Sequence, residues 1–142
     1  MFTGEYRHSV DDKGRLAVPS KFRAQLDSGA VLSRWVDDCL AIHTPAGWNA
    51  LAEKVATLPI GDRNARLFER FIFGGAYDTT LDGQGRVLLP AYLRDLAKLQ
   101  GEAVVVGSRD HAEIWAPDRW DTYRRDLEDP ESLAAALEGL GI

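Results

Sequence analysis

The fold is decided by one stretch of sequence that occurs twice, first as Val10-Asp11-Asp12-Lys13-Gly14-Arg15-Leu16-Ala17-Val18-Pro19-Ser20-Lys21-Phe22-Arg23 and again as Leu81-Asp82-Gly83-Gln84-Gly85-Arg86-Val87-Leu88-Leu89-Pro90-Ala91-Tyr92-Leu93-Arg94. One constant offset of 71 relates Asp11/Asp82, Gly14/Gly85, Arg15/Arg86, Pro19/Pro90 and Arg23/Arg94. A second match follows at an offset of 72, where Ile42, Pro45 and Trp48 correspond to Ile114, Pro117 and Trp120. Two matching blocks, whose offsets differ by one net inserted residue in the second half, indicate an internal duplication.

Each half is expected to begin with a β-hairpin followed by a helix. The pattern predicts one hairpin from residues 5–10 and 15–18 and another from residues 76–81 and 86–89. The connecting Asp-x-x-Gly is a tight turn in which Asp bonds the following backbone and Gly takes a positive φ. Pro19 and Pro90 end these strands and begin helices over 20–26 and 91–99.

The remaining elements also follow in the same order in both halves. Strands are predicted over 30–36, 40–43, 103–106 and 112–115, with second helices beginning at Pro45 and Pro117. Between the halves, 62–73 is predicted to be a helix that Asp62 caps and Gly74-Gly75 ends. Pro130 introduces a last helix over 131–140.

The duplication also predicts the domain organisation. We expect a first repeat over 1–59, a linker helix in 60–75, a second repeat over 76–126, and an acidic C-terminal helix or tail over 127–142. A half of this size exposes sheet edges and cannot bury both faces of its sheet alone. The two repeats are therefore expected to interlock as one intertwined domain.

Composition excludes several classes of protein. With 142 residues, 45% hydrophobic and 27% charged, the chain fits one folded domain and not a disordered one. No apolar run approaches the roughly 20 residues that span a bilayer, and the start lacks a signal peptide's apolar core, so we expect a cytoplasmic protein without membrane partners. The single Cys39 excludes a disulfide and a cysteine-based zinc cluster, and the histidines are far apart, so neither metal nor cofactor is expected.

For nucleic-acid binding, the distribution of charge along the chain is more informative than the net charge. The net charge of −5 by itself argues against nucleic acid as a partner. Residues 1–98, however, hold 13 Lys and Arg against 12 Asp and Glu, whereas residues 99–142 hold 4 against 10. Because binding depends on local potential, a basic DNA-binding surface outside the C-terminal third remains compatible with this acidity.

These motifs resemble the MraZ family of bacterial transcriptional regulators, whose repeats belong to the SpoVT/AbrB-like class. The resemblance covers nearly the whole chain and includes the opening Phe2-Thr3-Gly4-Glu5-Tyr6-Arg7-His8, the two Asp-x-x-Gly-Arg motifs and the helix that opens at proline after each. The resemblance implies an α+β fold, a pseudo-twofold β-barrel of two interlocked, swapped β-hairpin repeats surrounded by short helices.

The resemblance also implies a function. It indicates a sequence-specific DNA-binding regulator, associated with the nucleoid, that represses a division and cell-wall gene cluster including its own gene. Such a protein would bind repeated promoter boxes on double-stranded DNA as a homo-oligomer, in the form of a ring. No enzymatic activity and no small-molecule substrate are expected.

The candidate DNA-binding residues belong to the two hairpins: Arg15, Arg86, Lys13 and Arg7, with Asp11, Gly14, Asp82 and Gly85 shaping the turns. Taken alone, the residues favour a structural pairing of each Arg with the Asp of its turn. The duplication and the resemblance favour contact with DNA, where Arg binds guanine bidentately or holds phosphate. Because Gln84 stands where the first turn has Lys13, the first turn is expected to bind more strongly.

Other conspicuous residues are given structural interpretations. Arg23 and Arg94 are expected to be solvated or to form ion pairs, and Asp37-Asp38 to form a hairpin turn. Arg63, Arg66 and Arg70 share one helix face, where a subunit contact is at least as well supported as phosphate binding. The histidines, the tryptophans and Tyr92 are expected in structural, core or subunit-contact positions.

Two alternative functions stay open. An AbrB-like antitoxin would bind a toxin through its C-terminal tail, where Leu133, Leu137 and Leu140 form a narrow apolar stripe. An enzyme on a small barrel would need a polar pocket, which the sequence does not indicate. A copurifying toxin would favour the first alternative, and ligand-dependent turnover the second.

Overall fold

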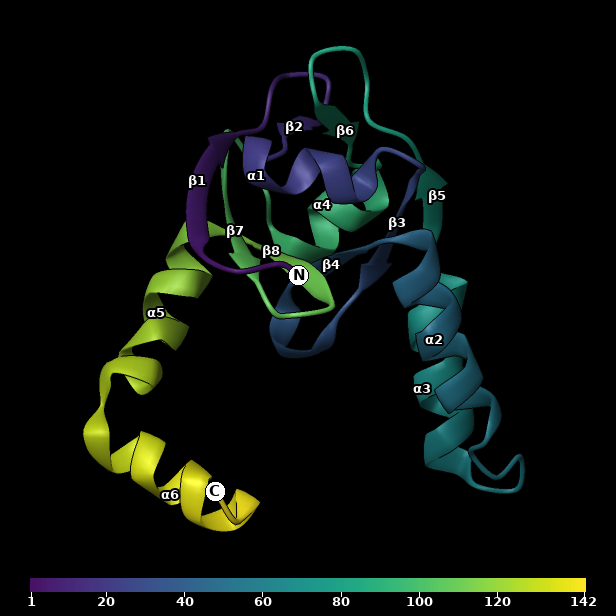
Figure 1. Ribbon diagram of the computed structural model, residues 1–142, viewed down its shortest axis with the longest axis vertical. Helices are drawn as coiled ribbons and strands as arrows, with labels where there is room; N and C mark the ends of the chain where they lie inside the picture. Colours follow the sequence, from purple (N-terminus) through teal and green to yellow (C-terminus); the bar gives the residue numbers. More distant parts are fainter.

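The computed structural model describes residues 1–142 and has the α+β class that the sequence predicts (Figure 1). Its strands are β1 (Glu5–Ser9), β2 (Arg15–Ala17), β3 (Ala30–Arg34), β4 (Leu40–His43), β5 (Tyr77–Thr79), β6 (Arg86–Leu88), β7 (Glu102–Gly107) and β8 (His111–Trp115). Its α-helices are α1 (Ser20–Arg23), α2 (Pro45–Ala56), α3 (Arg63–Gly74), α4 (Ala91–Ala97), α5 (Pro117–Glu128) and α6 (Pro130–Leu140). Two short 3-10 helices, η1 (Ala24–Leu26) and η2 (Val36–Asp38), complete the set.

The strands form two antiparallel sheets. Six of them are ordered β1-β7-β8-β4-β3-β5, while β2 and β6 pair separately with each other. Three ladders of the large sheet join the two halves of the chain, since β1 pairs with β7, β4 with β8, and β3 with β5. The hydrogen-bonded ladders leave β1 and β5 as edges of the large sheet and do not close it into a ring.

The simple hairpins expected within each half are therefore wrong. β1 and β2 form no ladder with each other, and β5 does not pair with β6; Val10, which follows β1, makes one isolated bridge to Leu16. β1 instead forms five residue pairs with β7, and β2 forms three with β6. Pairing between halves buries the apolar faces of both, which neither half can do alone.

One main core joins the two sheets. Twenty buried residues form a single cluster, and it includes Leu16 and Val87, which face each other across the β2–β6 ladder. Phe2 packs edge to face on Phe22, with ring centroids 5.1 Å apart. Each half thus supplies apolar side chains to a common interior, the term that dominates folding free energy.

Two helical arms leave this body on opposite sides (Figure 1). One arm contains α2 and α3, and the other contains α5 and α6. Asp62 caps α3 by accepting a hydrogen bond from the Asn64 amide at 2.8 Å, and Gly75 follows the helix end, as the sequence predicts. No residue of α6 is buried. No helix has the length and apolar character needed to cross a membrane.

Candidate nucleic-acid interface

The turn before β2 is organised around the Asp11 side chain. Its Oδ1 accepts hydrogen bonds from the backbone amides of Lys13 at 3.0 Å and Arg15 at 2.9 Å. The Gly14 amide donates to the Asp11 carbonyl at 2.9 Å, and Gly14 has a φ of 83°. The Arg15 Nε then donates to Asp11 Oδ2 at 2.7 Å, so that one carboxylate fixes both the turn and the arginine.

The turn before β6 repeats this geometry. Asp82 Oδ1 accepts from the amides of Gln84 and Arg86, each at 2.9 Å. The Arg86 Nε donates to Asp82 Oδ2 at 2.9 Å, and Gly85 has a φ of 73°. Asp and Gly therefore occupy equivalent places in the two turns.

The hydrogen bonds also stabilise the charged form of both carboxylates. The Arg15 backbone amide is the largest cause that lowers the pKa of Asp11 below its usual range. The Arg86 amide does the same for the pKa of Asp82. Both carboxylates are therefore ionised at neutral pH and continue to orient the two arginines.

Each turn is held in place by the other half of the chain. The Leu89 amide donates to the Gly14 carbonyl at 2.8 Å, and the Val18 amide donates to the Gly85 carbonyl at 3.0 Å. A Cβ atom at Gly14 would lie 2.6 Å from Arg94 Nε. The turns therefore protrude together as a paired unit, at the top of the molecule in Figure 1.

Arg23 and Arg94, expected to be solvated or ion-paired, instead bond to backbone carbonyls. Arg23 Nε donates to the Val18 carbonyl at 2.9 Å, and Arg94 Nε donates to the Leu89 carbonyl at 2.8 Å. Each guanidinium lies against the glycine of the opposite turn, Arg23 at Gly85 and Arg94 at Gly14. The repetition of both arginines at the offset of 71 indicates that they have the same role. The spacing does not say what that role is, because each arginine contacts the turn of the other half.

Arg15 and Arg86 are brought together by Asp11. Arg86 Nη1 lies 3.6 Å from Asp11 Oδ2, the oxygen that also binds Arg15. Arg86 thus has two carboxylate neighbours, whereas Arg15 has one. The end of the Arg15 guanidinium keeps both Nη groups free to donate.

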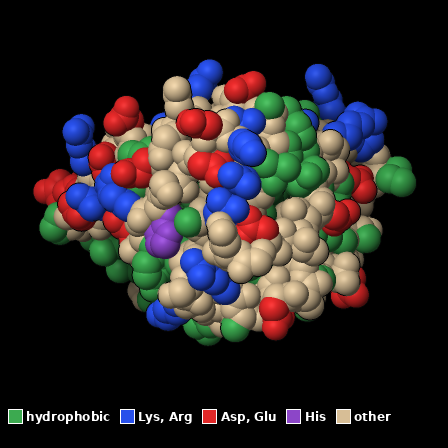
Figure 2. Space-filling view, turned by 90° about the horizontal axis from the view of Figure 1, so that it is seen from above, with side chains coloured by type: hydrophobic (Ala, Val, Ile, Leu, Met, Phe, Trp, Pro, Cys, Tyr) green, Lys and Arg blue, Asp and Glu red, His purple; other side chains and the backbone are tan.

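The tip residues differ more than the turns beneath them. Lys13 and Gln84 are both exposed, and Lys13 has no ion-pair partner. Figure 2 looks onto this end of the molecule and shows Lys and Arg side chains near its middle, interspersed with Asp and Glu. Positive and negative side chains are mixed at this end of the molecule. An anionic ligand would therefore be recognised there by the positions of individual hydrogen-bond donors more than by a net positive potential.

Arg7 lies apart from this group. It belongs to β1, where its Nη2 is 2.8 Å from Asp121 of α5 and its Nη1 is 3.5 Å from Glu102 of β7. The Asp121 hydrogen bond is the largest cause that raises the Arg7 pKa. The structure therefore brings Arg15, Arg86 and Lys13 together but places Arg7 in a strand-to-helix ion-pair network.

The histidines reveal a contact that sequence separation concealed. His43 and His111 face each other in the β4–β8 register, with stacked ring centroids 5.7 Å apart. His43 is buried and its Nε2 lies 2.9 Å from the Ser33 hydroxyl. Burial, followed by the neighbouring His111, lowers the pKa of His43 to about 4. The two rings therefore pack against each other on the sheet, and Asp37-Asp38 does form the β3–β4 turn.

Comparisons with known proteins agree with this architecture. The chain matches the family described as "MraZ protein, putative antitoxin-like" over residues 1–71 and 72–139. It is 43% identical over 143 residues to the transcriptional regulator MraZ of Halothermothrix orenii, with all of both chains covered. It is 45% identical to that of Moorella thermoacetica, again with full coverage, and 46% identical to that of Roseiflexus sp., with 95% and 94% covered.

Fold and site define an α+β protein with two sequence repeats, each presenting an arginine on an Asp-x-x-Gly turn at one end of the molecule. The chain belongs to the MraZ family.

Proposed function

We propose that this protein is a sequence-specific DNA-binding transcriptional regulator that reads double-stranded DNA with its paired turns. The observation that carries the proposal is the juxtaposition of Arg15 and Arg86, each anchored through Nε to the carboxylate of its own turn. Anchoring of this kind reduces the rotamer entropy lost when the outer guanidinium nitrogens bind a base or phosphate. The names of the relatives, which are transcriptional regulators, support the same class.

The proposed division of labour follows from exposure and partners. Arg15 has free Nη groups and is suited to bidentate contact with guanine. Lys13 is exposed at the tip and is suited to phosphate. Arg86, which two carboxylates share, contributes less, and Arg7 is excluded from the interface because its charge is already paired.

We also propose that several copies act together on repeated promoter boxes. Two short tips specify only a few base pairs, too few to select one site in a genome. Linked copies raise the effective concentration of every later contact, and a ring is the simplest closed assembly of one heterologous interface. In this proposal the protein represses a division and cell-wall gene cluster that includes its own gene. It acts in the cytoplasm, in association with the nucleoid.

The repeat organisation forms part of the proposal. Residues 1–59 and 76–126 act as two SpoVT/AbrB-like repeats of one intertwined, barrel-like domain, with 60–75 as linker and 127–142 as tail. The shared core and the pairing of β2 with β6 support this organisation. The protein acts by binding, without catalysis and without a cofactor.

A footprint on the DNA upstream of the protein's own gene tests the proposal. We expect protection of regularly spaced boxes by the wild type, and none by a variant that combines Arg15→Ala with Arg86→Ala. Templates with one box and with tandem boxes separate the two claims. Equal affinity for both templates contradicts cooperative binding, and unchanged protection by the double variant contradicts DNA reading by the turns.

One feature favours the antitoxin as a second candidate. The α6 residues Leu133, Leu137 and Leu140 are 47%, 37% and 71% exposed and belong to neither hydrophobic core cluster. An apolar stripe of this kind is typical of a surface that binds a partner. Copurification of a toxin that is lost on deletion of 130–142 would support it, and DNA binding that survives this deletion would separate the two functions.

A further inference from the structure

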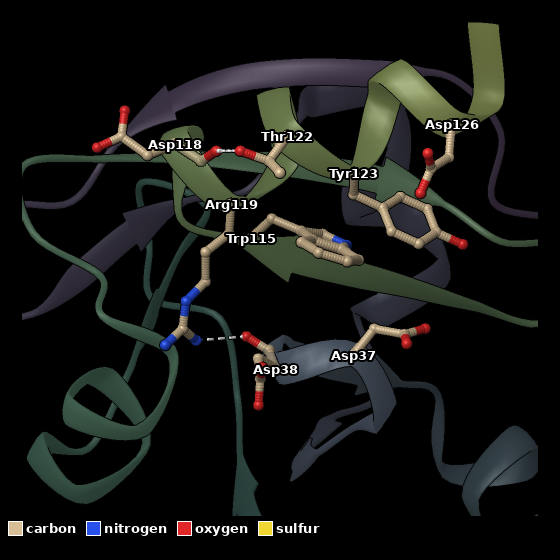
Figure 3. A pocket seen from close by; sticks show the side chains of 8 residues that line it. All are labelled: Asp37, Asp38, Trp115, Asp118, Arg119, Thr122, Tyr123 and Asp126. Atoms are coloured by element: carbon tan, nitrogen blue, oxygen red, sulfur yellow. Dashed lines mark hydrogen bonds between the residues drawn. The ribbon is translucent and has the colours of Figure 1, made fainter. Parts of the chain in front are cut away.

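We propose that an acidic, aromatic-floored cavity beside α5 receives the arginine stripe of α3 from a second copy of this chain. The cavity has a volume of about 500 Å³ and lies between α5 and the β3–β4 turn. Figure 3 shows four aspartates around it, two from the turn and two from the helix: Asp37, Asp38, Asp118 and Asp126. This inference goes beyond DNA binding and rests only on the proposed assembly of several copies.

The cavity lining holds four aspartates and one cation. None of the four aspartates forms an ion pair. Arg119 is the one cation that lines the cavity, and its Nη1 donates to the backbone carbonyls of Asp38 at 2.8 Å and Leu96 at 3.3 Å. Four like charges around one hollow repel one another, and an incoming cation relieves that repulsion.

The floor and wall of the cavity suit a guanidinium in particular. Trp115 is buried beneath it, and Tyr123 stands at its side with ring centroids 5.1 Å apart. Burial, then the charges of Asp37 and Glu113, raise the pKa of the Tyr123 phenol. Arginine combines stacking on aromatic faces with bidentate binding of carboxylates, which makes it the side chain best matched to this lining.

The chain supplies the complementary surface on its other arm. Arg63, Arg66 and Arg70 lie on one face of α3, and Arg63 and Arg70 are exposed without ion-pair partners. Beside them Leu67 is 67% exposed and Ile60 is 85% exposed. Exposed apolar residues next to unpaired cations are typical of a protein interface and add nothing to phosphate binding.

The spacings of the two surfaces agree. Asp118 and Asp126 are eight residues apart on α5, which corresponds to about 12 Å along the helix axis. Arg63 and Arg70 are seven residues apart on α3, which corresponds to about 10 Å. Two helices lying side by side can therefore pair both arginines with both carboxylates.

The two surfaces cannot meet within one chain. α5 packs near β7, whereas α3 packs on β3, close to the opposite edge of the six-stranded sheet. The arms leave opposite sides of the body and are far from the turns that carry Arg15 and Arg86 (Figure 1). Each copy therefore offers one acidic and one basic arm, and the contact is head to tail, leaving the turns free.

Charge exchange between the surfaces tests this contact. We expect the cavity variant Asp118→Arg with Asp126→Arg, and the stripe variant Arg63→Glu with Arg70→Glu, each to shift from assembly to single chains in sedimentation velocity. An equimolar mixture of the two variants should assemble again, because each then offers the other opposite charges. The matched control, Glu131→Arg with Glu138→Arg on α6, changes the net charge equally and should assemble like the wild type.

Separate measurements distinguish loss of assembly from loss of folding and from loss of DNA binding. Thermal unfolding checks that both charge-reversed variants fold, and the milder Asp118→Asn with Asp126→Asn should weaken assembly at least tenfold without reversing charge. The proposal is overturned if either reversed variant assembles like the wild type, if folded variants fail to assemble when mixed, or if the wild type is a single chain at tens of micromolar. Binding to one isolated DNA box, measured in parallel, should change less than twofold, so failure of this contact and failure of DNA reading are distinguishable.

Discussion

The two Asp-x-x-Gly-Arg turns have the same backbone but different surroundings. Their amide hydrogen bonds to Asp11 and Asp82 agree to within 0.1 Å. The first turn carries the free cation Lys13 and an arginine with one carboxylate neighbour, while the second carries Gln84 and an arginine with two. Duplication has thus preserved the scaffold, and the charged side chains at the tips have diverged.

A larger divergence lies on the sheet behind the turns, where His43 occupies the position that Trp115 has in the second repeat. Because the His43 pKa falls from 6.5 to about 4 on burial, the unfolded chain binds more protons between these pH values, and stability falls as the pH drops. We expect a loss of about 3 kcal/mol between pH 6.5 and 4 from this group.

Urea unfolding at several pH values measures this loss. His43→Gln keeps a polar partner for Ser33 and should lose about 3 kcal/mol less than the wild type over the same range. His111 serves as a comparison. Burial lowers its pKa, but the hydrogen bonds of Glu113 and Asp110 outweigh this and raise it, so its contribution is lost as pH rises above 6.5. If the free energy of unfolding falls equally for the wild type and His43→Gln as the pH drops from 6.5 to 4, another group causes the acid sensitivity.

The second prediction is that the two turn arginines contribute unequally to DNA binding. Arg15→Ala should weaken specific DNA binding by about 1–3 kcal/mol, or roughly 5- to 150-fold, because it removes a bidentate base contact. Arg86→Ala should cost less, since two carboxylates already share this guanidinium. Titration by fluorescence anisotropy measures both, and unfolding curves should match the wild type. Equal losses would mean that the repeats contribute alike.

The third prediction concerns the scaffold that the turns share. Gly14→Ala should destabilise the fold by about 1–2 kcal/mol, because a φ of 83° disfavours a side chain and its Cβ would meet Arg94. Gly83→Ala is the matched control, since a Cβ there meets no atom within 4 Å. Thermal unfolding of both variants is the measurement, and equal midpoints would contradict this role of the turn glycine.

The smallest expected effect is at the tips. Lys13→Gln should make the first tip resemble the second and weaken binding a few-fold, while Gln84→Lys should strengthen it by a similar factor. The slope of log affinity against log salt should become less steep by about 0.9 for the first change and steeper by about 0.9 for the second, one phosphate each. Slopes that do not move would show that neither tip touches phosphate.

Much of the local structure followed from residue patterns. The caps, the turn chemistry of Asp11 and Asp82, and most element boundaries agree with expectation because they depend on neighbours within a few residues. The errors were non-local. The pattern predicts that β1 and β2 pair across their turn and that Arg23 and Arg94 are solvated or ion-paired. Instead β1 and β2 pair with β7 and β6, and the two arginines lie against the turn glycines of the opposite half.

The sequence by itself determined the duplication, the α+β class, the two arginine-bearing turns and the asymmetry between Lys13 and Gln84, because a repeat and its turn residues are legible without three-dimensional contacts. Only the tertiary structure decided that Arg86 shares Asp11 with Arg15, that Arg7 is bound by Asp121, and that His43 stacks on His111. Arg86 is 71 positions from Arg15 and 75 from Asp11. Arg7 is 114 positions from Asp121, and His43 is 68 positions from His111. The geometry of these contacts depends on how the two halves share one core, and no local pattern encodes it.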